Sequence, residues 1–351
     1  MNDKLSATGI IVEYNPFHNG HIHHIHETKK IREGDVLIAV MSPNFVQRGE
    51  PAFIDKWIRT EYALKHGVDI VIELPTVFAL QSAETFAKEA IHLLNLAKVK
   101  TLVYGSESLD KPLLQSIDKK RIQEGFSYAA SKNMNNHQPN QILGAYYEKY
   151  AEQHHIKTHR ILRTKNYHDL TIDKTMASAS GIRNAFMMGE PIKNSTPLNL
   201  NDTDTYFLKD YYQWIRYEIL TTKENIRDYL LVDEGIEHLF IKLAKQCDTL
   251  EDFVEHATSK RYTRSRIQRT LCHILLKTPR QLESPTSFRV LGMSALGKSY
   301  LNQIRDDADF VSNIKNYEFK ETELKATFVY GLPYKKTDTL LIKEMGPPLI
   351  I

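Results

Sequence analysis

The chain has 351 residues, of which 42% are hydrophobic and 25% are charged, and its formal net charge is +3. This composition is typical of a folded protein of about two domains and excludes a disordered or collagen-like chain. The apolar runs are too short to span a membrane, and Cys247 and Cys272 are too few for a disulfide framework. With no basic and apolar leader at the N-terminus, we expect a cytoplasmic protein.

Short apolar runs alternate with segments of helical periodicity through the first half of the chain. Such runs favour a parallel sheet covered by helices on both faces. The expected strands are residues 7–14, 35–41, 69–74, 101–104 and 156–162, and the expected helices are residues 20–31, 54–65, 83–96 and 180–188. Ligands of parallel sheets bind beyond the carboxyl ends of the strands. The candidate site segments are therefore residues 14–21, 42–49, 105–107 and 166–169.

The composition changes around residues 191–201, where aromatic and charged residues begin to mix at helical spacing. An aromatic stripe of this kind, as in residues 205–217, is most often part of a helical core. We therefore expect an α/β domain over residues 1–192 and a mainly helical domain over residues 193–351. A short strand region is expected at residues 326–330.

The most informative motif follows the first expected strand, where His18-Asn-Gly-His21 leads into a helix. Gly20 allows the main chain to approach a phosphate group, and a helix start offers N–H groups and a positive dipole end. The two imidazoles can donate hydrogen bonds to phosphate oxygens as charge develops at the α-phosphorus. The motif resembles the signature of the nucleotidylyltransferase superfamily. We expect His18 and His21 to be catalytic residues of a nucleoside triphosphate site.

Two other interpretations stay open for the histidines of this segment. A cluster of imidazoles can bind zinc, but no cysteine is near and Glu27 is the only close carboxylate, so we predict no metal site. The last three histidines can also be exposed helix positions. The five are His18, His21, His23, His24 and His26.

A second candidate element is the run Ser178-Ala-Ser-Gly-Ile-Arg183. It resembles the Ser-Ser-Thr-x-x-Arg motif that closes the nucleotide site in the same superfamily, although its second position is alanine. Ser178 and Ser180 can cap a helix and bind phosphate, and Arg183 can neutralise charge. Alone this is an ordinary helix start. Together with the histidine turn, it favours Arg183 as a third catalytic residue.

Short sequence motifs in seven places narrow the resemblance from the superfamily to one family within it. They lie at residues 12–21, 47–52, 69–75, 105–107, 139–144, 167–169 and 260–263. Their order and content are similar to those of the bacterial tRNA(Met) cytidine acetate ligase family, except that residues 108–138 form a shorter segment than this family leads us to expect. The resemblance implies a Rossmann-like nucleotidylyltransferase domain with a parallel sheet, followed by a mainly helical tRNA-binding domain.

The same resemblance implies a reaction and its ligands. The enzyme would activate acetate with ATP and Mg²⁺ as acetyl-adenylate and acetylate N4 of the wobble cytidine of elongator tRNA(Met), with no DNA or membrane as partner. The arginine that precedes Tyr167-His-Asp169 is taken as Arg163, with Arg160 as the alternative. The residues implied to bind ATP are Ile11, Val12, Glu13, Tyr14, Asn15, Pro16, Phe17, His18, Asn19, Gly20, His21, Ile22, His23, His24, Gly105, Asn140, Arg163, Ser178 and Ser180.

A basic segment at residues 260–269 is the candidate tRNA contact. Ile267 and Leu271 have helical spacing and would face a core, so the cations would point outward toward RNA phosphates. A solvated helix face is the alternative interpretation. The candidate cations are Lys260, Arg261, Arg264, Arg266 and Arg269.

Three further residue groups have undecided roles. Residues 47–50, together with Lys56 and Arg59, could approach either ATP or the tRNA, whereas Glu13 could simply hold the turn by accepting backbone hydrogen bonds. For the whole chain, two other functions compete with the ligase. One is a nucleotidylyltransferase that acts on a small metabolite, and the other is an RNA-binding module with a decayed nucleotide site.

Overall fold

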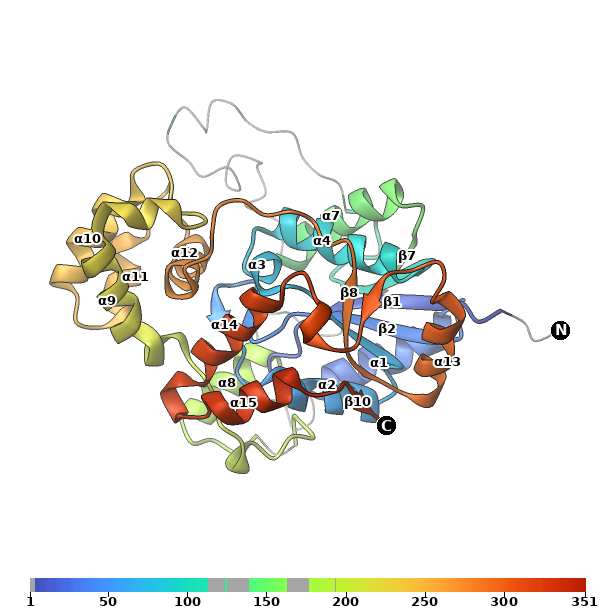
Figure 1. Cartoon of the computed structure of the whole chain (residues 1–351). Helices are drawn as coiled ribbons and strands as arrows, with labels where there is room; N and C mark the ends of the chain where they lie inside the picture. Colours follow the sequence, from blue (N-terminus) through green and yellow to red (C-terminus); the bar gives the residue numbers. More distant parts are fainter. Residues whose placement is uncertain (1–3, 113–123, 125–138, 163–176, 193) are drawn as a thin grey trace.

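A computed structural model describes residues 4–112, 124, 139–162, 177–192 and 194–351. Its centre is one eight-stranded sheet with helices on both faces (Figure 1). The strand order is β10-β8-β5-β2-β1-β6-β7, with β9 paired to β8. The strands are β1 (Ala7–Val12), β2 (Val36–Met41), β5 (Ile70–Glu73), β6 (Thr101–Ser106), β7 (Lys157–Leu162), β8 (Phe288–Met293), β9 (Phe310–Val311) and β10 (Leu349–Ile350).

Five neighbouring strands of this sheet, β5, β2, β1, β6 and β7, run parallel. Strand β8 runs antiparallel to β5, whereas β9 and β10 run parallel to β8. The expected α/β class and Rossmann-like arrangement are confirmed. The sheet is mostly parallel rather than wholly parallel, because β8, β9 and β10 run opposite to the other five strands.

Strand β2 shows how the sequence places helices on both faces of the sheet. All six of its residues are buried. Ile38 and Val40 pack with helices α3, α4, α7 and α13, whereas Leu37 and Ala39 pack with α1, α2 and α8 on the opposite face. The bounds are α1 (Asn19–Ile31), α2 (Lys56–Lys65), α3 (Thr76–Ala79), α4 (Ala83–Leu96), α7 (Pro139–Gln153), α8 (Ala179–Met187) and α13 (Ala295–Ile304).

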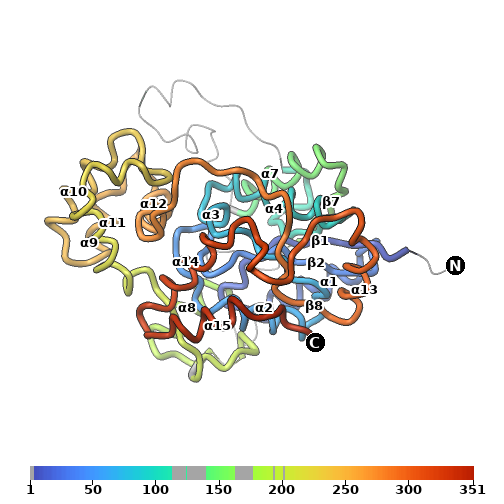
Figure 2. Tube along the Cα trace, in the orientation of Figure 1, coloured from blue at the N-terminus to red at the C-terminus, as the bar shows by residue number. Residues whose placement is uncertain are grey.

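Helices α9 to α12 form a separate group beside the sheet, coloured yellow to orange in Figure 2. Their core includes Ile219, Phe240, Phe253 and Leu271. The group comprises α9 (Tyr212–Thr222), α10 (Ile236–Gln246), α11 (Leu250–Ala257) and α12 (Arg264–Leu276). Helices α14 (Lys320–Gly331) and α15 (Thr337–Met345) follow, and short 3₁₀ segments occur at Leu200–Asp202, Leu208–Tyr211, Lys223–Asp228, Ile314–Asn316 and Leu332–Tyr334.

Two features of the second half differ from expectation. The predicted strand at residues 326–330 is wrong, because these residues lie within α14. Ala326 and Val329 pack against the α9–α12 core, while Thr327 donates a hydrogen bond to Glu344 from another side. The exposed position within residues 326–330 is held by Phe328, so the five residues form a run of mostly apolar side chains that resembles a buried strand. In addition, the expected domain boundary at residues 192 and 193 did not anticipate that β8, β9 and β10, from the second half of the chain, belong to the same sheet as the strands of the first half.

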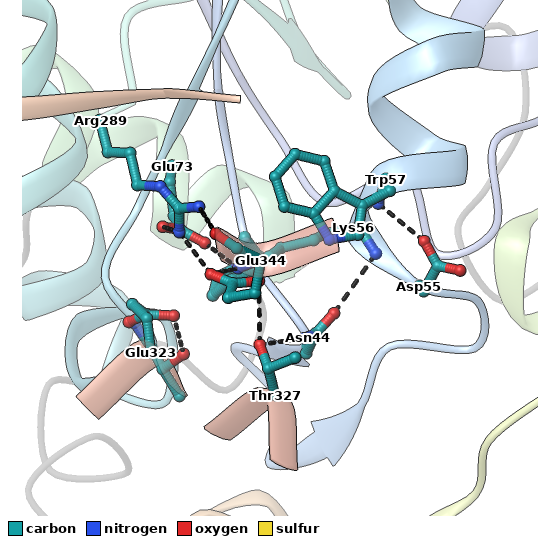
Figure 3. Close-up of polar contacts among 12 residues, drawn as sticks. Asn44, Asp55, Lys56, Trp57, Glu73, Arg289, Glu323, Thr327 and Glu344 are labelled. Atoms are coloured by element: carbon teal, nitrogen blue, oxygen red, sulfur yellow. Dashed lines mark hydrogen bonds and ion pairs between the residues drawn. The ribbon is translucent and has the colours of Figure 1, made fainter. Parts of the chain in front are cut away.

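Four buried charged side chains join α2, β5, β8 and α15 (Figure 3). Lys56 contacts Glu73 and lies 2.8 Å from Glu344, and Arg289 contacts Glu344 and lies 2.9 Å from Glu73. Burial and the nearby charge of Glu73 raise the pKa of the neighbouring Glu323, which disfavours a further negative charge here. Two cations and two carboxylates thus balance each other in the interior, which offsets their loss of hydration. Lys56 is therefore a buried structural residue and does not face a ligand.

His273 of α12 is fully buried, and its Nε2 lies 2.9 Å from the carbonyl oxygen of Leu80. A carbonyl oxygen can only accept, so the proton of the neutral ring is on Nε2. Burial lowers the pKa of His273 to about 4, and the ring is neutral in the folded protein near pH 7.

We expect the free energy of unfolding to fall as the pH is lowered from 6.5 to about 4. In this interval the unfolded chain binds a proton at His273 that the folded protein does not bind, so acid favours unfolding by up to about 3 kcal/mol. Urea denaturation at a series of pH values measures the effect, with His273→Gln as the control that lacks the titrating ring. A difference between the two proteins that stays constant with pH would contradict the assignment.

Candidate active site

The carboxyl ends of β1, β2 and β6 lie at one edge of the sheet, because these strands are parallel neighbours. Residues 13–18 connect β1 to α1 at this edge. A hairpin of β3 (Phe45–Val46) and β4 (Glu50–Pro51) follows β2, and residues 107–112 follow β6. This is the edge at which parallel α/β sheets bind ligands. We call it the nucleotide edge below.

Hydrogen bonds from distant segments fix the turn between β1 and α1. The Oδ1 atom of Asn15 accepts from the N–H of Phe53 at 2.6 Å. The hydroxyl of Thr196 donates to the carbonyl oxygen of Phe17 at 2.6 Å. The course of the turn is therefore determined by the fold itself, which positions the two histidines that follow.

His18 and His21 cap the start of α1 together. The Nδ1 atom of His18 accepts from the N–H of Gly20 at 3.0 Å, and the Nδ1 atom of His21 accepts from the N–H of His18 at 3.2 Å. The two rings stack with their centroids 3.7 Å apart. Because both Nδ1 atoms act as acceptors, each neutral ring carries its proton on Nε2. The cap therefore makes Nε2 the hydrogen-bond donor of both imidazoles, as binding to phosphate oxygens requires.

Gly20 has no room for a side chain. A Cβ atom there would lie 2.7 Å from Cε1 and 3.0 Å from Nδ1 of His18, so the imidazole would have to move. The sequence suggested that Gly20 makes room for phosphate; the structure shows that it also makes room for the ring of His18.

If the chain performs the reaction that the resemblance implies, Gly20→Ala should lower acetate-dependent ATP–pyrophosphate exchange by about 10²-fold, because a displacement of about 1 Å in a catalytic group has this effect. The melting temperature should change little. His26→Ala, at an exposed position of the same helix, is the control. An exchange rate equal to that of the wild type would mean that the His18 ring position is unimportant.

Arg183 of α8 reaches the same turn from the far side. Its Nη1 atom donates to the carbonyl oxygen of Asn15 at 2.7 Å, and its Nη2 atom lies 3.7 Å from Glu50. Ser178 caps α8 by accepting from the N–H of Gly181 at 3.0 Å. The structure thus brings the three predicted catalytic residues to one turn, with Ser178 and Ser180 at the start of the helix that carries Arg183.

Glu13 ends β1 beside three arginines. Its carboxylate accepts from the N–H of Gln47 at 2.8 Å, so it holds the hairpin rather than its own turn. Burial raises the pKa of Glu13, while this hydrogen bond and the positive charges of Arg48, Arg183 and Arg59 lower it. The pKa of Glu13 is raised overall, and arginines from three segments act on its carboxylate at the nucleotide edge.

At the end of β6, within the candidate segment 105–107, Asn140 contacts a carboxylate to which the sequence analysis assigned no role. The Nδ2 atom of Asn140 donates to Oε1 of Glu107 at 2.6 Å. The other oxygen of Glu107 is buried and has no hydrogen-bond partner in the described part of the chain. The Gly105-Ser-Glu107 string could have indicated this residue, because it directly follows a strand end.

The two arginine candidates near residue 162 have different outcomes. Arg163 and the segment 166–169 lie outside the described residues. Arg160, on β7, pairs with the buried Glu148, which also accepts from the hydroxyl of Tyr104 at 2.7 Å. Arg160 thus belongs to a hydrogen-bond network between β6, β7 and α7.

The β3–β4 hairpin joins the nucleotide edge to α12. Gly49 has a φ of +81°, and a Cβ atom there would lie 2.2 Å from the main-chain nitrogen of Arg269. The guanidinium of Arg269 points inward and donates to the carbonyl oxygen of Gln47 at 3.4 Å. Glu50 accepts from Gln268 at 3.4 Å with one oxygen and lies near Arg183 with the other. Arg269 therefore supports the hairpin and does not lie on the exposed face of α12.

The exposed arginines of the basic segment are paired with carboxylates. Arg264 pairs with Glu251 at 2.7 Å, and Arg261 and Arg266 pair with Glu234 at 3.2 and 3.3 Å. Any RNA phosphate that binds here must compete with these acidic side chains. The sequence alone could not reveal this, because Glu234 and Glu251 are distant from the arginines along the chain.

Membrane-spanning helices and metal-binding clusters are both absent from residues 4–112, 124, 139–162, 177–192 and 194–351. No helix in those ranges is long and apolar enough to cross a membrane. Likewise, nowhere in the described segments do three or more His, Cys, Asp or Glu side chains come together in a way that could hold a metal ion.

Comparison with known proteins gives the family. The HIGH Nucleotidyl Transferase model matches residues 5–344. The tRNA(Met) cytidine acetate ligase of Geobacillus sp. (strain WCH70) is 37% identical, over 99% of this chain and 100% of that protein. The protein of the same name from Leuconostoc mesenteroides is 40% identical, over 86% of this chain and 87% of its own length. The chain belongs to the tRNA(Met) cytidine acetate ligase family.

Solved structures agree with membership of the ligase family. Thermotoga maritima TmcAL in its apo form matches with a TM-score of 0.88 at 26% identity, over 99% of this chain and 100% of that chain. The same protein bound with alpha-thio ATP matches with a TM-score of 0.87 at 27% identity and the same coverage. The comparisons confirm the Rossmann-like nucleotidyltransferase fold. They favour the ligase over a nucleotidylyltransferase that acts on a small metabolite.

Proposed function

We propose that this chain converts acetate and ATP to acetyl-adenylate and transfers the acetyl group to N4 of the wobble cytidine of elongator tRNA(Met). Membership of the ligase family supports the overall reaction. The observation that carries the assignment to particular residues is the shared cap of α1, in which both Nδ1 atoms of His18 and His21 are occupied by main-chain N–H groups.

In the first step, an oxygen of acetate attacks the α-phosphorus of ATP, and the bond to the bridging oxygen breaks. Pyrophosphate leaves with that electron pair, and acetyl-adenylate remains. His18 and His21 donate from Nε2 to phosphate oxygens, and Arg183 supplies a full positive charge next to them. These groups position two anions and offset their mutual repulsion, which is the main requirement of phosphoryl-group chemistry.

Mg²⁺ would accompany the triphosphate rather than occupy a site made by the protein alone. Magnesium prefers oxygen ligands and usually keeps several waters. Glu107 fits as a protein ligand, because one of its oxygens lacks a partner among the described residues. When bound, the ion would neutralise phosphate charge.

In the second step, N4 of the cytidine attacks the acetyl carbonyl carbon, AMP leaves, and N4 gives up a proton. The base must leave its stack to reach the adenylate. We propose that Lys260, Arg261, Arg264 and Arg266 contact tRNA phosphates, and that the three arginines exchange their present carboxylate partners for them. Arg269 would act indirectly, through the hairpin.

Arg264→Gln should weaken tRNA binding and reduce the slope of log Kd against log salt by about 1, because one phosphate contact is lost. Glu251→Gln should have the opposite effect on affinity, since it removes the carboxylate that competes for Arg264. Filter binding across a salt series measures both variants. Equal affinity for the two would show that this part of α12 does not contact the tRNA.

The function itself is tested by incubating the protein with ATP, radiolabelled acetate and either tRNA(Met) or tRNA lacking it. Label should enter tRNA(Met) only, and pyrophosphate should be released only when acetate is present. Pyrophosphate release without acetate, or with a metabolite in its place, would instead indicate the small-molecule enzyme.

A further inference from the structure

Arg59 of α2 is fully buried, yet its guanidinium makes no ion pair within the described part of the chain. Its donors bind main-chain carbonyl oxygens instead. The Nη1 atom lies 2.7 Å from the carbonyl oxygen of Glu13 and 2.8 Å from the carbonyl oxygen of Ser42. The Nε atom lies 3.0 Å from the carbonyl oxygen of Ile54, and Nη2 donates a hydrogen bond to the carbonyl oxygen of Pro43.

Three of these carbonyls, those of Glu13, Ser42 and Pro43, follow the ends of two strands that form the nucleotide edge, β1 and β2. Glu13 directly precedes the turn that carries His18. Ser42 and Pro43 follow β2 and lead into the hairpin whose Glu50 lies beside Arg183. One guanidinium therefore fixes both strand ends relative to each other. A lysine could not replace it, because an ammonium has three donors and lacks the rigid planar fork.

The charge of Arg59 is also distinctive. Lys56 and Arg289 lie in the same interior, but two glutamates balance them. Main-chain carbonyl oxygens are the direct partners of the Arg59 guanidinium, and Asp55, Glu13 and Glu73 act on its charge only from beyond ion-pair distance. Burial lowers its pKa to about 10, so the group still carries its proton at neutral pH. A buried charge is weakly screened by salt and water, and its potential extends to the adjacent surface.

We infer that Arg59 is a positioning residue for the triphosphate, which fixes the ends of β1 and β2 and contributes a positive charge that no ion pair neutralises beneath the anionic ligand. This inference rests on the proposed placement of ATP at the β1 turn. It assigns to α2 a part in nucleotide binding without direct contact with the nucleotide.

The test compares Arg59→Gln, which keeps polar donors but loses the charge, with Arg59→Lys, which keeps the charge but loses the fork. Affinities for adenosine, AMP, ADP and ATP are measured by calorimetry with a chelator present. Arg59→Gln should weaken ATP about tenfold and AMP about two- to threefold, with ADP between them and adenosine unchanged. Arg59→Lys should keep the wild-type ratio of ATP to adenosine affinity within about threefold.

Equal weakening of all four ligands in both variants would overturn the inference, since it would indicate a structural role alone. So would wild-type affinities in both. Arg305→Gln, at an exposed arginine after α13, controls for the loss of one charge elsewhere. If Arg59→Gln fails to unfold cooperatively, Arg59→Lys decides, and a tenfold fall in its ATP to adenosine ratio overturns the inference. Failure of the wild type to bind ATP would instead reject the proposed function.

Discussion

The His21→Ala variant should lose about 10²–10³-fold in the rate of acetate-dependent pyrophosphate release, because one donor to the developing phosphate charge is removed. His18→Ala should lose a similar factor. The melting temperature should change little, since the rings of both histidines lie at the nucleotide edge rather than in the centre of the core. Single-turnover release of pyrophosphate measures the rate, and thermal unfolding measures the stability.

Conservative variants separate the two tasks of His21. His21→Asn can still accept from the N–H of His18 near the Nδ1 position but lacks a donor near Nε2, so its rate should remain low. His21→Gln places an amide nitrogen near Nε2 and should recover part of the rate. A wild-type rate in His21→Asn would reject donation from Nε2, because only the capping acceptor would then matter.

The free energy of unfolding should fall by about 3–5 kcal/mol in Lys56→Met, because removal of one partner leaves an uncompensated charge in the interior. Lys56 is fully buried between Glu73 and Glu344, and only Arg289 would remain to balance both carboxylates. Urea denaturation at neutral pH provides the measurement. A loss below about 1 kcal/mol would mean that the cluster relaxes without cost.

Two further variants make the cluster experiment specific. The double variant Lys56→Met with Glu344→Gln again has balanced charges, so it should be more stable than Lys56→Met alone. Lys65→Met breaks the pair with Glu61 on the same helix, in which both side chains are about half exposed. Its stability should stay close to that of the wild type, since exposed pairs contribute little.

Most of the first half of the fold was predictable because its strands are continuous apolar runs that end at clear turn residues. Strand β8 was not predicted, since Arg289 interrupts its apolar run and a lone arginine in a sequence suggests an exposed position. Its burial depends on Glu73 and Glu344, which come from distant parts of the chain. Propensity and periodicity carry no information about such partners.

The candidate site likewise contains residues that the sequence could predict and residues that it could not. The histidine turn and Arg183 were predictable because short motifs carry them, and the structure brings both to one turn. The roles of Arg59 and Arg269 were not, because a helical arginine has the same sequence signature whether it faces RNA, a carboxylate or a main-chain carbonyl. Only the packing of α2 and α12 distinguishes these cases.

The tip of the β3–β4 hairpin rests with the main chain of Gly49 directly against the main chain of α12, so no side chain lies between them to absorb a displacement. Helix α12 cannot slide past the hairpin without carrying Glu50 along. A displacement of α12 would therefore reach Arg183 through Gln268 and Glu50, which joins the helical group mechanically to the turn that carries the two histidines.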